Sequence, residues 1–176
     1  LIDGCEVYNV GGNGIRIGVD KEVRRANIFT DSQVSNCRIH AFEELDRIYN
    51  PGISLQGLGS RALNNEIYDA PHLGMSYVGT NIEIAYNIFE NLCYDSSDAG
   101  ALYIYDATFN SGGTRIHDNI VRNIINDEGE FFNPNGIYLD AGSGGMQVYS
   151  NIIENVDGYG LLSGGPDNEI CDNLFI

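Results

Sequence analysis

The sequence predicts an all-β protein that folds as a right-handed parallel β-helix, and three observations support this prediction. Glycine-led segments recur along the chain, an Asn-rich pattern recurs between them, and the composition suits short strands joined by turns. Among 176 residues there are 22 Gly, a single Lys and no Trp. Self-similarity with a period of about 20 to 50 residues is typical of solenoids, in which each repeat packs on its neighbours.

The first repeat consists of segments that begin at a glycine and then run apolar-polar-apolar. Alternation with a period of two predicts short strands with one buried face. Successive glycines are 38, 22, 26, 36 and 24 residues apart, so two turns of the solenoid are enlarged by insertions. The six segments are Gly14-Ile15-Arg16-Ile17, Gly52-Ile53-Ser54-Leu55, Gly74-Met75-Ser76-Tyr77, Gly100-Ala101-Leu102-Tyr103, Gly136-Ile137-Tyr138-Leu139 and Gly160-Leu161-Leu162-Ser163.

The second repeat is the pattern Asn-Ile-apolar-charged-Asn. It occupies residues 87–91, 119–123 and 151–155, at intervals of 32 residues, and a further copy starts at Asn173. A short alternating segment precedes each copy, which makes three strands per turn. Asn suits the corners because it tolerates left-handed backbone and its side-chain amide can form a ladder with the Asn of the next turn.

Two competing folds fit less well. A leucine-rich-repeat horseshoe would need the pattern L-x-x-L-x-L-x-x-N, which the chain lacks. A β-sandwich would need hairpin turns at shorter spacing. The chain starts at Leu1 and stops inside what looks like another repeat. We therefore expect residues 1–176 to be an internal part of a single β-helix domain of a longer protein, without its end caps.

The formal net charge of −16 disfavours nucleic acid and anionic membrane surfaces as partners. No segment approaches the roughly 20 apolar residues that span a bilayer. The four cysteines form no C-x-x-C pair, which argues against a zinc site. We expect them to be buried as small hydrophobic residues, and a disulfide stays open. They are Cys5, Cys37, Cys93 and Cys171.

Alignment on the glycines places the long insertions at one corner of successive turns. These loops form a predicted wall rich in carboxylates and aromatic residues, and we look for function there. The opposite corner carries small residues at 57–60, 78–80, 109–113, 142–145 and 163–166. The wall loops are 41–51, 69–73, 94–99 and 126–135.

Asp98 and Asp140 are the candidate catalytic carboxylates, since two carboxylates on adjacent turns can share the work of glycosidic cleavage. The alternative is that each caps its own turn. With Gly100 and Gly136 in register, the two residues are offset by about six positions, or roughly 20 Å. Such an offset is too long for a pair that flanks one bond. Either the turn at Asp98 folds back, or Asp106 replaces it as partner.

Other side chains on or beside this wall suit sugar binding. His72 can orient a substrate hydroxyl, and Tyr103, Tyr105 and Tyr138 can stack on sugar rings. His40 and His117 are interpreted as structural. No P-loop, nucleophile elbow or His/Cys metal cluster is present, so no cofactor is expected. Calcium stays open, with carboxylate ligands from Asp127, Glu128 and Glu130 or from Asp95 and Asp98.

Four strings over residues 50–176 resemble the β-helix glycoside hydrolases of the fucosidase and xylanase type. That resemblance implies that the Asp in the D-x-G-A-I-Y segment and the Asp in the I-Y-L-D segment, here Asp98 and Asp140, form the catalytic pair. The strings are Ala70-Pro71-His72, Asp98-Ala99-Gly100-Ala101-Leu102-Tyr103, Gly136-Ile137-Tyr138-Leu139-Asp140 and Gly164-Gly165-Pro166-Asp167-Asn168.

The chain departs from the pattern of these relatives at three places. Ile104-Tyr105-Asp106-Ala107 stands where relatives have G-R-D-W, Ala141 replaces a second Asp, and Pro166 replaces an Arg. Substrate contacts are therefore expected to differ from those of the relatives.

We expect an exported enzyme, secreted, periplasmic or on the cell surface, that hydrolyses glycosidic bonds in a polysaccharide or oligosaccharide. Two rivals stay open. A polysaccharide lyase would need a basic residue to abstract a proton and a cation to neutralise the uronate. A chain with a single Lys is poorly equipped for this chemistry. A non-catalytic β-helix would bind carbohydrate or serve in adhesion.

Overall fold

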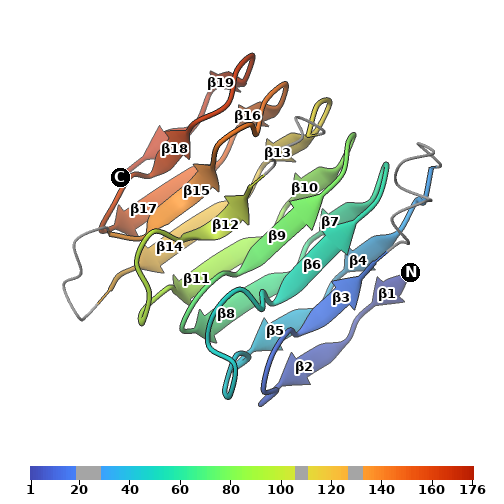
Figure 1. Cartoon of the computed structure of the whole chain (residues 1–176), viewed down its shortest axis with the longest axis vertical. Coiled ribbons are helices and arrows are strands. Elements are labelled where there is room, and N and C mark those ends of the chain that lie inside the picture. Colours follow the sequence, from blue (N-terminus) through green and yellow to red (C-terminus); the bar gives the residue numbers. More distant parts are fainter. Residues whose placement is uncertain (19–28, 106–110, 127–132) are drawn as a thin grey trace.

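The computed structural model describes residues 1–18, 29–105, 111–126 and 133–176. Within these residues the regular structure consists of β-strands, and no helix is present that could cross a membrane. The chain winds as a right-handed parallel β-helix. Each complete turn contributes one strand to each of three parallel sheets (Figure 1). The predicted fold class is confirmed.

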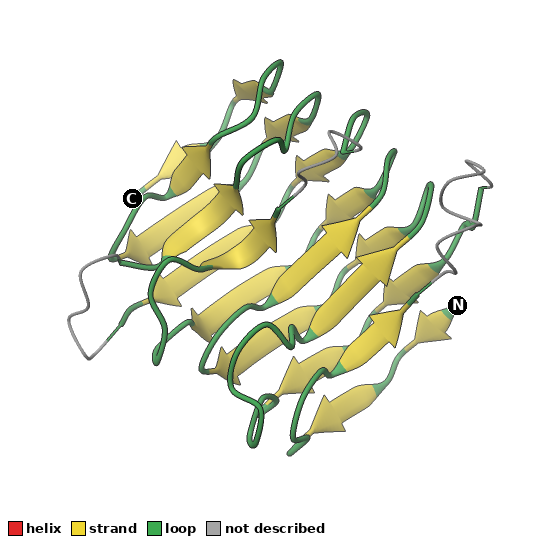
Figure 2. Ribbon diagram, in the orientation of Figure 1, coloured by secondary structure: helices red, strands yellow, loops and turns green. Residues whose placement is uncertain are grey.

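The three sheets are named A, B and C in the order in which each turn visits them, and Figure 2 shows their strands stacked side by side. Sheet A contains β1 (Ile2–Asp3), β4 (Gln33–Ser35), β7 (Arg61–Leu63), β10 (Glu83–Ala85), β13 (Arg115–His117), β16 (Gln147–Tyr149) and β19 (Glu169–Cys171). Sheet B contains β2 (Glu6–Tyr8), β5 (Arg38–His40), β8 (Glu66–Ala70), β11 (Ile88–Leu92), β14 (Ile120–Ile124), β17 (Ile152–Val156) and β20 (Leu174–Phe175). Sheet C contains β3 (Ile15–Ile17), β6 (Ile53–Gln56), β9 (Met75–Val78), β12 (Gly100–Ile104), β15 (Asn135–Leu139) and β18 (Leu161–Ser163).

Inward side chains stack in columns along the solenoid because every strand pairs in register with its counterparts in the adjacent turns. Each fully buried aliphatic residue contributes about 1.5 to 3 kcal/mol through removal of apolar surface from water. One column runs through sheet B and another through sheet C, and both are almost fully buried. They consist of Ile39, Ile67, Phe89, Val121 and Ile153, and of Ile53, Met75, Leu102 and Ile137.

A ladder of buried Asn side chains occupies the corner between sheets A and B. Asn119 shows the pattern: its Nδ2 donates to the Oδ1 of Asn151 at 2.9 Å, and its Oδ1 accepts from the Nδ2 of Asn87 at 3.0 Å. The same amide also donates to the carbonyl of Ile84. Asn65 and Asn173 extend the ladder at its two ends. The predicted amide ladder is confirmed.

The two Asn residues of the Asn-Ile-apolar-charged-Asn pattern have different tasks. The first, as in Asn119, has its amide buried in the ladder. The second, as in Asn123, lies one residue before the end of its strand in sheet B, with a φ of 55°. A left-handed residue turns the chain from sheet B towards sheet C, and Asn adopts this conformation at low cost.

Glycines precede the strands of sheet C because two turns approach each other closely there. A Cβ on Gly136 would lie 2.5 Å from the carbonyl oxygen of Gly160. The alignment of Gly100 with Gly136 is wrong by one residue, because Gly100 pairs with Asn135. Ala101 stands at the position aligned with Gly136, so this turn accommodates a methyl group.

The prediction of burial holds for two of the four cysteines. Cys37 and Cys93 are buried, whereas Cys5 and Cys171, in the first and last described turns, are exposed. All four thiols are free. His40 stacks between Tyr8 and Tyr68, and His117 stacks on Tyr149, as expected for structural histidines.

Candidate active site

The long loops lie on one wall, as predicted, since each of them leads from a strand of sheet B into a strand of sheet C (Figure 1). Loop 41–51 follows β5, loop 71–74 follows β8 and loop 93–99 follows β11. The described residues 125, 126, 133 and 134 belong to the same wall in the next turn. The loops therefore border the outer face of sheet C along one edge.

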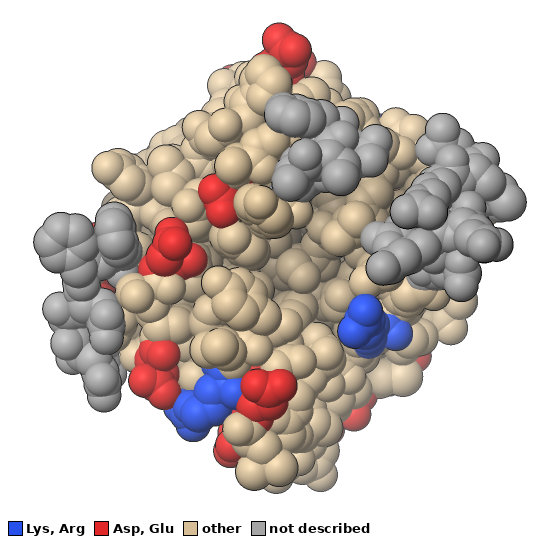
Figure 3. All heavy atoms as spheres, viewed as in Figure 1, with Lys and Arg blue, Asp and Glu red and all other residues tan. Residues whose placement is uncertain are grey.

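The outer face of sheet C carries the polar residues of the glycine-led strands. In-register pairing aligns them across five turns, in the row Arg16, Ser54, Ser76, Tyr103 and Tyr138. Figure 3 views this face: carboxylates gather mainly towards the loop wall, and uncharged atoms line the hollow in the middle. The row thus passes from Arg16 and two serines to two tyrosines where the carboxylates are found.

Asp140 is held against the first of these tyrosines. It directly follows β15, and its backbone N donates to the carbonyl of Ile104 in the neighbouring strand. The hydroxyl of Tyr103 donates to its Oδ2 at 2.8 Å, and the backbone N of Ala141 donates to its Oδ1 at 2.6 Å. The carboxylate of Asp140 therefore hydrogen-bonds the backbone of the next residue and also contacts the sheet face.

Asp98 reaches the second tyrosine from the loop wall. It is exposed and adopts a left-handed backbone with a φ of 48°. The hydroxyl of Tyr138, in the next turn, donates to its Oδ1 at 3.3 Å. The left-handed residue directs its carboxylate back over sheet C, where the carboxylate meets a side chain 40 positions further along the chain.

The two tyrosines bring the two carboxylates together, because Tyr103 donates to Asp140 and Tyr138 donates to Asp98. The rings of these two donors are neighbours, with centroids 5.2 Å apart. Pairs that cleave glycosidic bonds are about 5 to 10 Å apart. The separation of roughly 20 Å expected from a straight strand is therefore wrong for the side chains, since the turn at Asp98 folds back.

Both tyrosines remain protonated donors over the ordinary pH range. Burial, followed by the hydrogen bond and charge of Asp140, raises the pKa of Tyr103 above its usual 10. Burial and the charges of Asp140 and Asp98 raise the pKa of Tyr138 to about 12. The two rings lie edge to face with their centroids 5.2 Å apart. They form a rigid base that orients the two carboxylates.

Of the remaining predicted site residues, some are described by the structure and others are not. Tyr105 is 54% exposed and directly follows β12. That strand pairs with β15, which Asp140 follows. Asp106, the substitute partner, lies outside the described residues, as do Asp127, Glu128 and Glu130, the first calcium candidates. Among the described residues, no group of three or more His, Cys, Asp or Glu side chains is placed to hold a metal ion.

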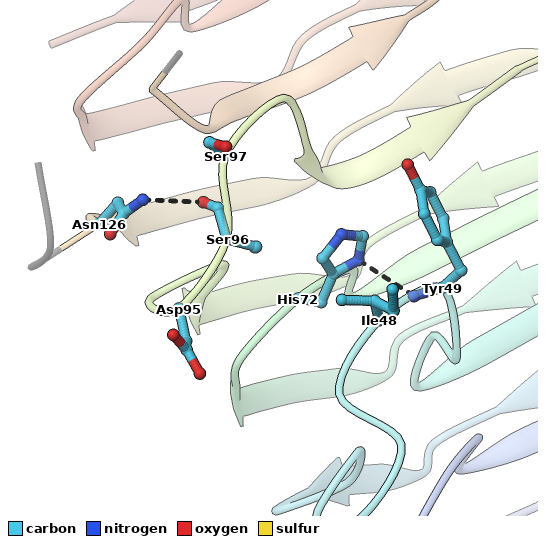
Figure 4. Close-up of a pocket in the computed structure, with 7 residues that line it drawn as sticks. All are labelled: Ile48, Tyr49, His72, Asp95, Ser96, Ser97 and Asn126. Atoms are coloured by element: carbon cyan, nitrogen blue, oxygen red, sulfur yellow. Dashed lines mark hydrogen bonds between the residues drawn. The ribbon is translucent and has the colours of Figure 1, made fainter. Parts of the chain in front are cut away.

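His72 lies beside a cavity of about 300 Å³ between loops 41–51 and 93–99. Figure 4 shows the ring of Tyr49 standing next to the imidazole, with loop 93–99 on the opposite side of the cavity. The cavity is lined by Ile48, Tyr49, His72, Asp95, Ser96, Ser97 and Asn126. The last of these donates from its Nδ2 to the carbonyl of Ser96 at 3.1 Å, which ties two wall loops together.

The imidazole of His72 is neutral. Its Nδ1 accepts a hydrogen bond from the backbone N of Tyr49 at 3.4 Å, and the two rings are in edge contact at 4.9 Å. Burial lowers the pKa of His72 to about 4. A neutral imidazole whose Nδ1 accepts carries its proton on Nε2, so the second ring nitrogen is a hydrogen-bond donor.

Glu43 closes the base of loop 41–51. Its side chain is fully buried, and its Oε1 accepts from the backbone N of Asn50 at 2.7 Å. Burial raises the pKa of Glu43 to about 8, so this carboxyl is protonated at neutral pH. The contact holds the two ends of the loop together and thereby presents Tyr49 to the cavity.

Sequence reasoning missed Tyr49 and Glu43 as members of this region. Both belong to a wall loop that the glycine alignment identified. Glu43 is followed by Glu44 and Asp46, and nothing in the sequence distinguishes the buried carboxyl from its exposed neighbours. Tyr49 has a left-handed φ of 56°, which is unusual for a large side chain and is not visible in the sequence.

No family model matches the sequence, and no curated protein matches it. Among the solved structures, the chain is similar to one named "Glycoside hydrolase", with a TM-score of 0.61 and 17% sequence identity. The match covers 98% of this chain and 31% of that structure, so the chain spans about a third of its neighbour's length. At this identity the likeness supports the fold of three parallel sheets.

Proposed function

We propose that the chain carries the active site of a carbohydrate-active enzyme that hydrolyses glycosidic bonds, with Asp98 and Asp140 as its carboxylate pair. The observation that carries the proposal is the pair of neighbouring tyrosines, Tyr103 and Tyr138, which donate to the two carboxylates from adjacent strands of the solenoid. Glycosidic cleavage needs two carboxylates about 5 to 10 Å apart across the scissile bond.

The reaction divides between the two carboxyl groups. One donates its proton to the glycosidic oxygen as the bond to the anomeric carbon breaks. The other either attacks the anomeric carbon or removes a proton from the water that attacks it. The net change adds a hydroxyl group to the anomeric carbon and a proton to the leaving sugar. Asp140, with its two short hydrogen bonds, is the better oriented of the two.

The finer assignment to the fucosidase and xylanase type rests on the matching strings around Asp98 and Asp140. The printed name of the structural neighbour is in keeping with a hydrolase of this general kind. We place the enzyme outside the cytoplasm, as part of a single β-helix domain of a longer protein. Substrates of this class are extracellular polysaccharides or oligosaccharides derived from them.

Hydrolysis measured across a polysaccharide panel tests this proposal. Asp98→Asn and Asp140→Asn each replace a carboxylate by an amide of nearly equal shape, and each should lower the rate by about a thousandfold or more. Asp69→Asn, near the end of β8 beside the same wall, is the matched control and should keep its activity. Full activity in both site variants would refute the carboxylate pair.

A non-catalytic β-helix that binds carbohydrate is the rival that the exposed tyrosines favour. It would bind sugar with the same affinity when both carboxylates are replaced, and it would release no product. A lyase is disfavoured, because the Arg47 guanidinium on this wall is already paired with Asp95 at 2.7 Å. Unsaturated products that absorb in the ultraviolet would revive it.

A further inference from the structure

The cavity beside His72 is contiguous with the proposed catalytic face. Ser97, which lines the cavity, immediately precedes Asp98. Tyr49, on the other side, stands with its ring beside His72 and faces loop 93–99 across the cavity (Figure 4). A sugar chain that lies across Tyr103 and Tyr138 would therefore run directly towards the cavity.

The size and lining of the cavity suit a single sugar ring. Its volume of about 300 Å³ lies at the lower end of the range of about 300 to 1,000 Å³ for small-molecule sites. Tyr49 is 63% exposed although it is held at its backbone and by the edge contact with His72. An exposed aromatic ring in a fixed position is the usual partner of the C–H face of a sugar.

Among the described residues that line the cavity, the polar groups are hydrogen-bond donors and acceptors without a free positive charge. The Nε2–H of His72 is a neutral donor, and Ser97 adds a hydroxyl group. The nearby cation, Arg47, contacts the Oδ2 of Asp95 through both Nε, at 3.0 Å, and Nη2, at 2.7 Å. A sugar carboxylate would therefore meet Asp95, with Asp98 one residue beyond the lining residue Ser97, and no unpaired cation among the described residues that line the cavity.

We propose that this cavity is a subsite for one uncharged sugar unit of the substrate chain, held against Tyr49 and closed to uronate units. This proposal rests on the proposed function, since it assigns the cavity to the substrate of Asp98 and Asp140. It makes the enzyme selective for neutral chains long enough to reach from the carboxylates to Tyr49. Glu43 is a positioning residue for the subsite, because it fixes the loop that carries Tyr49.

Titration calorimetry on the inactive Asp98→Asn/Asp140→Asn protein tests the subsite. The probes are cellohexaose, xylohexaose and laminarihexaose as neutral chains, and hexagalacturonate as the uronate chain. We expect at least one neutral probe to bind, and hexagalacturonate to bind about tenfold more weakly or not at all. Tyr49→Ala in this background should weaken the neutral probe by about five- to tenfold.

Tyr86→Ala is a closely matched control. Tyr86 is 57% exposed, has a φ of 61° and makes an edge contact with a buried histidine, His117, at a distant corner. This variant should bind the neutral probe within about twofold of its parent. Ser97→Trp keeps Tyr49 in place and fills the cavity mouth, and it should weaken binding as Tyr49→Ala does.

The outcomes separate the subsite from the proposed function. Unchanged affinity in Tyr49→Ala and Ser97→Trp, equal binding of hexagalacturonate, or no binding of any neutral probe would overturn the subsite. Continued hydrolysis by the single Asp98→Asn and Asp140→Asn variants would overturn the carboxylate pair and leave the binding result standing. If these variants lose hydrolysis and Tyr49→Ala leaves the affinity unchanged, the carboxylate pair stands and the subsite is overturned.

Discussion

The corner between sheets A and B and the corner between sheets B and C are built on opposite principles. At the first, each turn from Asn65 to Asn151 repeats one buried amide at the same place. At the second, the connecting segments differ in length and composition from turn to turn, and they carry Glu43, Tyr49, His72 and Asp98.

The difference teaches where a solenoid can vary. An amide in the ladder bonds to the turns before and after it, so a change at one turn leaves partners unsatisfied in its neighbours. A loop at the other corner extends outwards, and its insertions leave the sheets in register. The constant corner thus supports the fold, and the variable corner supplies the chemistry.

The largest effect is predicted for a substitution in the Asn ladder, at the constant corner between sheets A and B. Asn119→Ala removes the donors and the acceptor that link Asn87, Asn151 and the Ile84 carbonyl. Because several buried polar groups lose their partners, we expect the free energy of unfolding to fall by about 4 kcal/mol. Chemical denaturation monitored by circular dichroism measures this loss.

Asn123→Gly is the control for the ladder variant. Asn123 has a φ of 55°, which glycine adopts freely, and its side chain lies outside the ladder. The free energy of unfolding should change by less than about 1 kcal/mol. Equal losses in Asn119→Ala and Asn123→Gly would show that the two Asn residues of the repeat do not differ as described.

A smaller effect is predicted at the variable corner, where Glu43 makes stability depend on pH. Burial raises the pKa of this carboxyl from 4.5 to about 8, so the folded protein holds a proton that the unfolded chain has lost. Stability should therefore decline as the pH rises from 4.5 through 8. Glu43→Gln, which mimics the protonated form, should remove this decline and gain about 2 kcal/mol relative to the parent at pH 9.

Denaturation midpoints between pH 5 and 9 in both proteins measure this difference. His72 acts in the opposite direction, because its pKa is lowered from 6.5 to about 4 on burial, and its contribution is lost as the pH falls through that range. That acidic loss should persist in Glu43→Gln. Parallel pH profiles of the two proteins above pH 6 would contradict the burial of a protonated Glu43.

The smallest effect is predicted for the tyrosine that contacts Asp98 from the next turn. Tyr138→Phe removes the hydroxyl that donates to Asp98 and keeps the ring against Tyr103. We expect kcat/KM for hydrolysis to fall by about tenfold, with little change in stability. Tyr159→Phe, at an exposed tyrosine, should leave the rate unchanged.

Much of the fold could be predicted because repetition is visible in the sequence. The glycine and Asn repeats indicate three strands per turn, the amide ladder and the wall to which the insertions belong. The register at Gly100 could not be predicted, since whether a turn needs glycine or accepts Ala101 depends on the distance to the next turn.

The site was predictable in its residues and not in its geometry. Asp98 and Asp140 follow from the pattern, whereas their approach depends on a left-handed φ of 48° at Asp98 and on the reach of the Tyr138 side chain. The burial of Glu43 and the place of Tyr49 over His72 arise from the packing of a loop against a neighbouring turn. Such contacts between turns have no counterpart in local sequence.

The most direct measurement of the central claim is hydrolysis by Asp98→Asn, Asp140→Asn and the double variant on one substrate. If the two carboxylates act as a unit, each single variant should lose about a thousandfold or more, and the double variant should lose at most about tenfold beyond the worse single one. Independent losses that multiply in the double variant, or activity retained in either single variant, would contradict a catalytic pair.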